Sequence, residues 1–591
     1  MMQIPAPNAW SPNALAVFRA RYLKRDEHTH APSETPEQLL RRVARHVAAA
    51  ELAWGASETE RLGWEENFFA LLCRGIFLPN SPTLMNSGRE LGLLSACIVL
   101  PIEDSIESIF ETLKHTALIQ KAGGGTGFDF SRLRPRGDLV RSSGGKASGP
   151  VSFLHVYSTA TSAIQQGAFR RGANMGILRT DHPDIVEFIR SKDDRQSLTN
   201  FNISVSIPDE FIRQVESDPR GPHFVRNPRT GKHHRLARGG RTGEYWTAGE
   251  VFDLITERAC ATGEPGVIFL DRINRDNPTP ALGTIAATNP CSEQPLLPYE
   301  ACTLGSINLV KFTSGAGLDW ANFRQTVRTA TRFLDDVVEV NRLPVPETER
   351  LCRLNRKIGL GIMGFADALF ALSLPYDSDD AVALGERIME TLNETAHDES
   401  EALARVRGPF PAWKGSRWDT KEGRPQRNAT VSTIAPTGTI SILAGCSGGI
   451  EPVFSLAFHR NILDGGRFLE VNPIFIQAAR ERGFYSTRLV ERLLETGTLQ
   501  TLEELPSDMK QVFQTARDVS PEAHVRMQAA FQRHCDSGIS KTINFPGSAT
   551  PADVRSIYLK AFHAGVKGVT VYRDGSRPHQ PMALNHCKGC E

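Results

Sequence analysis

The chain has 591 residues, of which 40% are hydrophobic and 23% charged, so it can bury a large core and is not a disordered protein. Its 68 Lys and Arg residues against 67 Asp and Glu give a net charge of +1, which provides no field for holding a nucleic-acid duplex or an anionic membrane. An enzyme-sized globular protein remains, and binding to polymeric nucleic acid is a poor hypothesis.

The first residues lack a basic start followed by an apolar run, and nowhere do about 18 apolar residues follow one another. This predicts a soluble, cytoplasmic protein with no membrane span. Ten cysteines in 591 residues are too few for a disulfide scaffold. Any special cysteines are therefore expected to be redox-active, catalytic or metal-binding.

Residues 37–75 carry apolar residues at mixed spacings of three and four, which predicts amphipathic helices. From about residue 76, short apolar runs alternate with helical stretches such as 105–122, and this alternation favours an α/β core. The basic stretch 213–245 is interpreted as a surface excursion with a hairpin turn in PRTGK. The polar, Pro-containing residues from about Ser576 onward predict a mobile tail.

The most informative segment is TNPCSEQPLLPYEACTLGSIN, in which Asn289, Cys291 and Glu293 alternate. In an extended segment this spacing points an amide, a thiol and a carboxylate to one side, and two nearby prolines disfavour a helix. The three groups offer a hydrogen-bonding positioner, a sulfur reactant and a candidate general base. A proline-rich turn with a buried cysteine and a capping glutamate is the alternative.

Two further cysteines and two glycine-rich segments are additional candidates for a functional site. Cys302 follows Cys291 by 11 positions, whereas Cys97 lies far upstream, where an isolated buried cysteine is also a common finding. The segments KAGGGTGFDFS and IAPTGTISILAGCSGG have small and hydroxyl residues whose backbone amides could approach phosphate oxygens. Neither is a P-loop or a G-x-G-x-x-G motif, so tight-turn packing remains an alternative for both.

At this point the sequence resembles the ribonucleotide reductases, and within them the adenosylcobalamin-dependent class II enzymes. The resemblance covers most of the chain in a fixed order of motifs: LPNSPTLMNSG, ACIVLP, AGGGTGFDFS, DHPDIVEFI, NFNISVSIP, NPCSE, APTGTIS, GGIEP and VYRDGSRP. NPCSE is highly specific, whereas DHPDI or GGIEP alone would be weak.

The resemblance implies a role for each group. Cys291 becomes a transient thiyl radical that abstracts hydrogen from C3′ of a ribonucleotide, Glu293 takes the 3′-hydroxyl proton, and Asn289 holds the sugar hydroxyls. Loss of the 2′-hydroxyl as water requires two electrons and protons, which Cys97 and Cys302 supply by closing a disulfide. The fold must then bring their Cα atoms within about 7 Å.

The same resemblance implies two nucleotide sites. The expected substrate contacts are Ser81, Ala96, Gly125, Asn289, Pro436, Thr437, Gly438, Thr439 and Ile440. A second site binds a dNTP effector that selects the base to be reduced. The segments that resemble its loops are 141–153 and 191–200, flanking Asp181, with Lys192 and Arg195 as candidates. A charged surface turn is the alternative there.

The expected source of the radical depends on a segment in which this sequence differs from class I relatives. Class I relatives receive the radical through adjacent tyrosines in a KTxYYxR segment, but here Thr570 and Val571 occupy the tyrosine positions and only Tyr572 is near. The C-terminus also lacks the Arg-x-x-Gly-Tyr type of glycyl-radical segment of class III. The resemblance therefore implies adenosylcobalamin, bound base-on because no Asp-x-His-x-x-Gly occurs, with no protein residue as a metal ligand.

The terminal Cys587 and Cys590 fit a tail dithiol that re-reduces the buried disulfide and is itself reduced by thioredoxin. A zinc knuckle that uses His579 or His586 is the alternative, although no second Cys-x-x-Cys completes a four-cysteine site. Cys446, close to the second glycine-rich segment, has no assigned role.

The family's fold implies a ten-stranded α/β barrel of two five-stranded parallel halves, with the Cys291 loop threaded through its centre. The expected domains are an N-terminal helical region at 1–77, the barrel at 78–575 and a redox tail at 576–591. No ATP-cone regulatory domain is expected.

A homodimer and a diphosphate substrate are expected by analogy with the dimeric members of the family. The rivals are a class I large subunit with a metal-containing partner, and a nucleotide-binding redox sensor that makes no deoxynucleotide.

Overall fold

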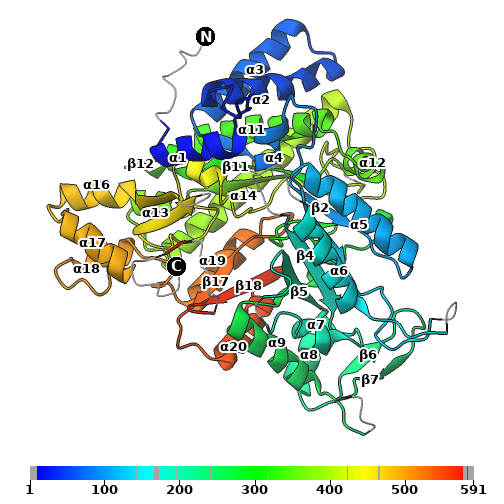
Figure 1. Cartoon of the computed structure of the whole chain (residues 1–591). Coiled ribbons are helices and arrows are strands. Elements are labelled where there is room, and N and C mark those ends of the chain that lie inside the picture. Colours follow the sequence, from blue (N-terminus) through cyan, green and yellow to red (C-terminus); the bar gives the residue numbers. More distant parts are fainter. Residues whose placement is uncertain are drawn as a thin grey trace.

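The structure is a computed structural model, and it describes residues 10–140, 144–164, 172–194, 196–239, 243–315, 317–421, 423–462, 466–576 and 582–583. Figure 1 shows helices from the N-terminal part of the chain on one side of a central sheet, and a smaller helical lobe projecting from another side.

The N-terminal region is helical, and the helices predicted over residues 37–75 are confirmed. Its elements are α1 (Pro12–Val17), the π-helical turn η1 (Phe18–Tyr22), α2 (Pro36–Ala48), the 3-10 turn η2 (Ala49–Trp54) and α3 (Glu58–Cys73). Helices α2 and α3 begin after Thr35 and Ser57, whose hydroxyls accept hydrogen bonds from backbone amides in capping boxes.

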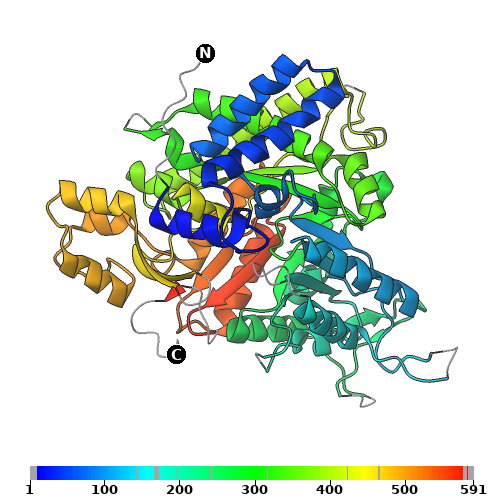
Figure 2. The ribbon, with the colours of Figure 1, turned by 45° about the horizontal axis from the view of Figure 1, so that its top comes forward.

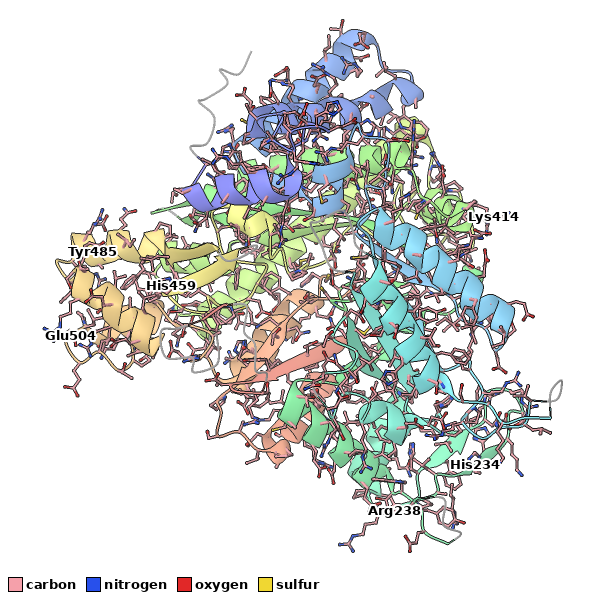
Figure 3. All side chains as sticks on the ribbon, viewed as in Figure 1. His234, Arg238, Lys414, His459, Tyr485 and Glu504 are labelled. Atoms are coloured by element: carbon pink, nitrogen blue, oxygen red, sulfur yellow. The ribbon has the colours of Figure 1, made fainter. Side chains whose placement is uncertain are left out.

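One half of the central sheet consists of parallel strands with connecting helices. Its strands in spatial order are β2 (Cys97–Leu100), β3 (Gly125–Asp129), β4 (Asn174–Arg179), β5 (Phe201–Ile207) and β8 (Gly266–Phe269). Its helices are α5 (Ile106–Lys121), α6 (Pro150–Ala163), α7 (Ile185–Ile189), α8 (Asp209–Ser217) and α9 (Ala248–Thr262). Helix α5 confirms the helix predicted over 105–122. The predicted surface hairpin is formed by β6 (Phe224–Arg226) and β7 (His233–Arg235), near the labelled His234 in Figure 3.

The other half is built around β1 (Phe77–Pro79), β11 (Ala301–Asn308), β14 (Ile358–Met363), β17 (Thr542–Phe545) and β18 (Gly568–Arg573). Its helices are α11 (Trp320–Val340), α12 (Pro346–Asn355), α13 (Phe365–Ala371), α14 (Asp379–Arg407), α15 (Ile440–Ala444), α19 (Pro521–Gln532) and α20 (Pro551–His563). Within this half β11 is parallel to β14, and β17 is parallel to β18.

The two halves close into a barrel. Strand β11 is antiparallel to β2, and β18 is antiparallel to β8, so the halves meet at two antiparallel junctions. Parallel bridges from Leu360 to Ser432 and from Ile434 to Ile539 carry the segment around 432–434 between β14 and β17 and complete the ring. The ten-stranded sheet confirms the expected α/β barrel.

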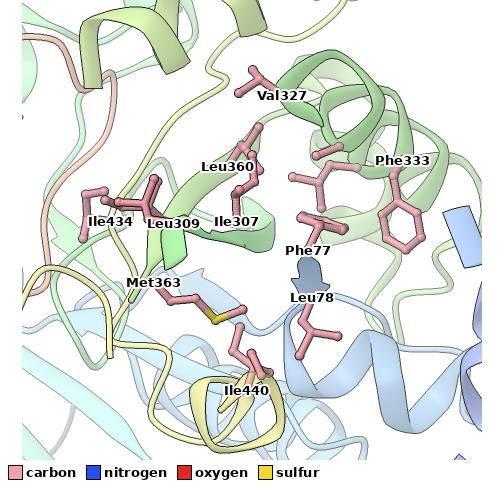
Figure 4. Close-up of a cluster of buried hydrophobic side chains, with 14 of the residues drawn as sticks. Phe77, Leu78, Ile307, Leu309, Val327, Phe333, Leu360, Met363, Ile434 and Ile440 are labelled. Atoms are coloured by element: carbon pink, nitrogen blue, oxygen red, sulfur yellow. The ribbon is translucent and has the colours of Figure 1, made fainter. Parts of the chain in front are cut away.

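A large apolar core lies between the second half and the helices outside it. Figure 4 shows Phe77 of β1, Ile307 of β11 and Leu360 of β14 near Phe333 of α11, and each is at most 1% exposed. Burial of such a side chain contributes about 1.5–3 kcal/mol. Ile440 belongs to the same cluster, so the core anchors one end of the expected phosphate-binding turn.

A separate lobe extends from the barrel and has its own small core. It contains β15 (Ala457–Ile462), β16 (Gly466–Val471), α16 (Pro473–Glu481), α17 (Thr487–Thr496) and α18 (Ser507–Val512). The short strand β19 (Met582–Ala583) pairs with β15, which brings the end of the described chain back to this lobe. Figure 2 shows the lobe in yellow and orange at the edge of the molecule.

The remaining elements are short and lie in connections: α4 (Ser81–Asn86), α10 (Leu270–Arg275), η3 (Pro280–Leu282), β9 (Ala287–Thr288), β10 (Pro295–Leu296), η4 (Leu309–Phe312), β12 (Thr313–Ser314) and β13 (Gly317–Leu318). Of the helices in the described ranges, none has both the length and the apolar composition needed to cross a bilayer.

Candidate active site

Cys291 lies in a tight turn that joins the antiparallel strands β9 and β10. The Ser292 N–H donates to the Asn289 carbonyl at 3.0 Å, and the Gln294 N–H donates to Asn289 Oδ1 at 2.9 Å. Ser292 has a φ of 65°, in the left-handed region. The prediction of an extended segment is therefore wrong, because these hydrogen bonds make the chain reverse direction between Asn289 and Gln294.

The turn nevertheless brings the three predicted side chains to one place. Asn289 is 1% and Glu293 is 2% exposed, whereas Cys291 is exposed at the tip between them. All three line a cavity of about 340 Å³. The proposed reactant is thus open to an incoming molecule, while the amide and the carboxylate beside it are shielded from bulk water.

The same cavity contains every substrate contact expected from the sequence. Its lining includes Ser81, Ala96, Gly125, Asn289, Pro436, Thr437, Gly438, Thr439 and Ile440, together with Cys97. These residues come from α4, from the β2 and β3 edge of the first half, from the β9–β10 turn and from the segment before α15. Stretches hundreds of positions apart therefore meet in one hollow.

Glycines in the barrel wall make room for the β9–β10 hairpin. A Cβ atom on Gly127 of β3 would lie 1.8 Å from the Thr288 carbonyl oxygen, and one on Gly538 would lie 2.7 Å from the Ser292 carbonyl oxygen. A Cβ on Gly125 would lie 3.3 Å from the Pro290 ring. The GGGTG segment thus has a packing role, the alternative recognised from its sequence, while Gly125 also lines the cavity.

Cys97 and Cys302 are directly opposite each other across the β2–β11 junction. Residues opposed in an antiparallel pair have Cα atoms about 4.5–5.5 Å apart. That spacing is inside the limit of about 7 Å for a disulfide. The two thiols come from positions 205 apart in the sequence, and the junction between the two barrel halves makes them neighbours.

The Asn289 side-chain amide links the turn to this pair by donating to Cys97 Sγ at 3.1 Å. Burial raises the pKa of Cys97 well above its ordinary value, and the nearby Glu293 carboxylate adds to the effect. Burial likewise raises the pKa of Cys302, against a smaller opposing influence of Lys357. Both residues are therefore neutral thiols at neutral pH.

The PTGTI segment forms a strained turn in the lining of the cavity. Thr437 has a φ of 50°, and its hydroxyl accepts a hydrogen bond from the Gly449 N–H at 2.8 Å. A Cβ on Gly448 would lie 2.9 Å from the Pro436 carbonyl oxygen, and one on Gly449 would lie 2.8 Å from the carbonyl oxygen of Ala435 just before the segment. The GCSGG glycines therefore let two backbone stretches approach closely and fix the shape of the turn.

The N-terminal helical region contributes two lining residues that were not predicted from the sequence. Arg21 and Tyr22 belong to η1, in the N-terminal helical region. Tyr22 Oη is 2.9 Å from Ser81 Oγ, and Arg21 Nη1 donates to Thr439 Oγ1 at 3.2 Å. Nothing in the sequence RARYL distinguishes these residues from others in an amphipathic helix; only the tertiary packing does so.

Two of the effector candidates, Asp181 and Lys192, do not line this cavity. Asp181 accepts two hydrogen bonds from the Arg179 guanidinium at 2.8 and 2.9 Å. Lys192 forms an ion pair with the buried Glu264 at 2.5 Å. Arg195 and residues 141–143 lie outside the described residues, as do both tail cysteines, Cys587 and Cys590. Their roles stay predictions.

Comparison with known proteins extends this picture. The ribonucleotide reductase all-alpha domain matches residues 10–92, and the ribonucleotide reductase barrel domain matches residues 95–572. Among solved structures, the alpha subunit of the class Id ribonucleotide reductase of Actinobacillus ureae has a TM-score of 0.78 at 25% identity, and the match covers 96% of this chain and 98% of that one.

Curated relatives are more similar in sequence. A vitamin B12-dependent ribonucleoside-diphosphate reductase of Mycobacterium tuberculosis is 50% identical, and one of Thermoplasma acidophilum is 47% identical. Each match covers 96% of this chain and 80% of the relative. Because the two domain matches leave out little beyond the two ends, and these relatives align along the same length, the chain belongs to the ribonucleotide reductase family.

Proposed function

We propose that the protein is an adenosylcobalamin-dependent, class II ribonucleoside-diphosphate reductase that makes 2′-deoxyribonucleotides and so supplies DNA precursors. The observation that carries the proposal is the cross-strand pairing of Cys97 with Cys302 beside the Cys291 turn. A dithiol next to a third, exposed thiol and a buried carboxylate matches what the removal of a 2′-hydroxyl requires. The names of the B12-dependent relatives support the diphosphate substrate and the cofactor class.

In the proposed reaction, a thiyl radical on Cys291 abstracts the hydrogen atom from C3′ of the ribose. Glu293 accepts the 3′-hydroxyl proton, and the Asn289 amide holds the sugar hydroxyls. The exposed position of Cys291 and the burial of Glu293 and Asn289 support this division of roles. Burial of the base and the positioner excludes water from the reacting atoms.

Cys97 and Cys302 then supply two electrons and two protons while a sulfur–sulfur bond forms between them. The 2′-hydroxyl leaves as water, and Cys291 returns its hydrogen to C3′. The net change converts one ribonucleotide and two thiols into one deoxyribonucleotide, one disulfide and one water. The raised pKa values of both thiols support this step, because a protonated thiol brings its hydrogen as well as its electron.

The site is compatible with an external radical source. Cys291 is exposed and lines the cavity, and Ser292 beside it is half-buried, so a bound cofactor can reach this tip. We expect adenosylcobalamin to lie against these two residues, base-on, with no protein ligand to cobalt. When bound, it supplies homolysis of its cobalt–carbon bond as the origin of the radical. Thr570 and Val571, in place of a tyrosine pair, support a source on this chain.

The proposed enzyme also needs a way to reduce the Cys97–Cys302 disulfide after each turnover and a site that selects the base. Cys587 and Cys590 would reduce the Cys97–Cys302 disulfide and then be reduced by thioredoxin or a similar dithiol protein. A dNTP effector site near Asp181, Lys192 and Arg195 would select the base.

A homodimer is supported by an exposed apolar face on α5 and α6. Ile106 and Phe110 are 59% and 48% exposed, and Leu118 and Val156 are also exposed. Large apolar side chains grouped on two neighbouring helices are typical of a protein interface.

The test is anaerobic conversion of labelled CDP to dCDP by the purified chain with thioredoxin, thioredoxin reductase and NADPH, in the dark. Reactions with and without adenosylcobalamin are compared across a panel of dNTP effectors. Product that depends on the cofactor is the expected result. Failure with every effector, with CTP as substrate and with dithiothreitol as reductant would overturn the cobalamin assignment and favour a class I large subunit that needs a partner.

A further inference from the structure

The cavity has an uneven distribution of charge. Among the described residues that line it, Glu293 is the only carboxylate and Arg21 is the only cation. Glu293 lies beside Cys97 and Cys291, at the end where the sugar is expected to react. Arg21 contacts Thr439, within the turn expected to hold the phosphates. The positive charge therefore lies beside the turn that is expected to hold the negatively charged phosphates of a nucleotide.

The position of Arg21 is set by the packing of the helix that carries it. Phe18 and Tyr22, on the same π-helical turn, are 0% and 1% exposed. The Leu23 N–H donates to the Phe18 carbonyl at 3.1 Å, which closes the wide turn. Because both aromatic neighbours are buried, the Arg21 side chain is held toward the cavity. Such π-helical turns are frequent at functional sites.

The hydrogen bonding of Arg21 is incomplete. Its Nη1 donates to the Thr439 hydroxyl at 3.2 Å, but its buried Nε has no partner among the described residues. The nearby Arg42 and Arg89 differ, because both pair with Glu34. Arg21 has no carboxylate within ion-pair distance in the part of the chain that the structure describes. A buried guanidinium donor without an anion is costly unless a ligand provides the anion.

We propose that Arg21 binds the diphosphate of the substrate and thereby makes the N-terminal helical region part of the substrate site. The guanidinium presents several N–H donors in one plane, a geometry suited to phosphate oxygens. With Thr439 and the backbone amides of the PTGTI turn, it would surround the phosphates from two domains. The assignment rests on the proposed function, since it takes the ligand to be a ribonucleoside diphosphate.

The experiment compares wild-type protein with Arg21→Gln, Arg21→Lys and the control Arg19→Gln. Arg19 is exposed on the same turn and does not line the cavity. The measurements are kcat and KM for CDP and the inhibition constant of inorganic pyrophosphate. For Arg21→Gln we expect both KM and the inhibition constant to rise about 10- to 100-fold, the usual effect of removing a charge-assisted hydrogen bond. We expect kcat at saturating CDP to change less than about 3-fold.

Arg21→Lys retains the charge but loses the planar donors, so its inhibition constant for pyrophosphate should rise about 3-fold, and it serves if Arg21→Gln does not fold. An unchanged KM and inhibition constant in the Arg21 variants, or a loss of kcat alone, would overturn the assignment. A similar loss in Arg19→Gln would do the same. If wild-type protein makes no dCDP, the proposed function fails separately; calorimetric titration with CDP and pyrophosphate then still tests Arg21, because Arg21→Gln must weaken both.

Discussion

At the scale of single residues, the site combines one exposed thiol with several buried polar groups and thiols. Cys291 is open at the tip of its turn, whereas Asn289, Glu293, Cys97 and Cys302 are at most 6% exposed. In the proposed reaction the Cys291 thiyl radical must meet both a cofactor and a substrate, so its thiol has to be accessible. Asn289 and Glu293, which act only on the substrate in that reaction, can stay buried.

Replacing Cys291 with Ser should abolish dCDP formation, because a hydroxyl cannot take the place of a thiol as the radical carrier. The exposed position predicts little effect on folding, with a change in the free energy of unfolding within about 0.5 kcal/mol. Product formation and urea denaturation are the two measurements. Cys260→Ser, which alters a thiol that donates to the Ala549 carbonyl elsewhere in the fold, is the matched control and should keep full activity. Residual turnover in Cys291→Ser would contradict its role.

The sequence predicted which residues meet better than it predicted how they meet. The alternation of Asn289, Cys291 and Glu293 was correctly taken as one group, but the left-handed Ser292 and its turn were not foreseen, because Ser carries no strong signal for that conformation. Arg21 could not be found at all. Arg21 lines the cavity because its helical turn lies next to Thr439, which comes more than 400 positions later in the sequence.

At the scale of elements, the β9–β10 hairpin fits only because the strands around it lack side chains at the points of contact. In Gly127→Ala, the added methyl carbon would lie only 1.8 Å from the Thr288 carbonyl oxygen. We expect the hairpin to be displaced, with loss of dCDP formation by at least about 100-fold and a loss of about 1–3 kcal/mol in stability. Enzyme assay and denaturant unfolding measure both.

Gly63→Ala is the control for that substitution. Gly63 lies in α3, and a Cβ there has no neighbour within 4 Å. Alanine should therefore leave activity unchanged and stabilise the helix by up to about 1 kcal/mol. Wild-type activity in Gly127→Ala would show that the hairpin does not depend on this clearance.

A buried histidine connects α14 to the segment after α19 and predicts a pH dependence. His397 Nε2 is 3.0 Å from Asp536 Oδ2, and its Nδ1 is 2.9 Å from Gln426 Oε1. Burial favours the neutral ring, but the Asp536 charge and the two hydrogen bonds outweigh it and raise the pKa of His397 above 6.5. Burial opposes ionisation of Asp536, but the charge and hydrogen bond of His397 outweigh it and lower the pKa of Asp536.

Because the folded-state pKa of His397 is raised, its charge stabilises the protein fully below about pH 6.5, and this contribution disappears as the pH rises through the folded-state pKa. The difference in unfolding free energy between wild type and His397→Gln should therefore be larger at pH 5.5 than at pH 9. His563→Gln, which breaks an exposed pair with Glu216, should give a small difference at both values. A difference for His397→Gln that is independent of pH would refute the interpretation.

The helices over 37–75 and 105–122 and the surface hairpin were predictable because their signals are local. The helix over 105–122 and the turn in PRTGK depend on periodicity and turn residues within a few positions. The segment around 432–434 was not identifiable as a wall of the barrel. It contributes isolated bridges at Ser432 and Ile434, and its pairing depends on strands that are distant in sequence.

At the scale of the whole molecule, a buried ionic cluster joins the N-terminal region to the barrel. Arg407 of α14 contacts Asp335 and Asp336 of α11 at 2.9 and 2.6 Å, and Glu51 of η2 at 2.8 Å. All four side chains are at most 2% exposed. Glu51 also pairs with Arg332, and Asp335 also pairs with Arg356 and Arg427. Among the described residues, Asp336 has no cation but Arg407 within ion-pair distance, and a charge so deeply buried requires a partner.

Arg407→Met should leave Asp336 without its cation and destabilise the protein by about 3–5 kcal/mol. Arg405→Met, two positions away in an exposed pair with Glu401, should change stability by no more than about 1 kcal/mol. Thermal unfolding of both variants is the measurement. Similar melting temperatures for the two would contradict the role of the cluster.

The closed barrel itself came from the family resemblance, since the pattern of strands and helices alone reaches only the α/β class. Ring closure is a property of the complete chain. It depends on the antiparallel junctions of β11 with β2 and of β18 with β8, which bring together residues about 200 and 300 positions apart. No local signal in the sequence encodes such contacts.

The location of Cys97 and Cys302 on the β2–β11 junction gives the proposed reaction a mechanical consequence. Oxidation would join the two barrel halves covalently and close a loop of 205 positions, which the chain-entropy relation values at about 5 kcal/mol. Each turnover would then alternate between a cross-linked and an open barrel. Oxidised protein should melt at a higher temperature than reduced protein, and Cys302→Ser should remove the difference. The reduced, substrate-ready enzyme is thus the more easily unfolded form, and its thermal lifetime should depend on the supply of reductant.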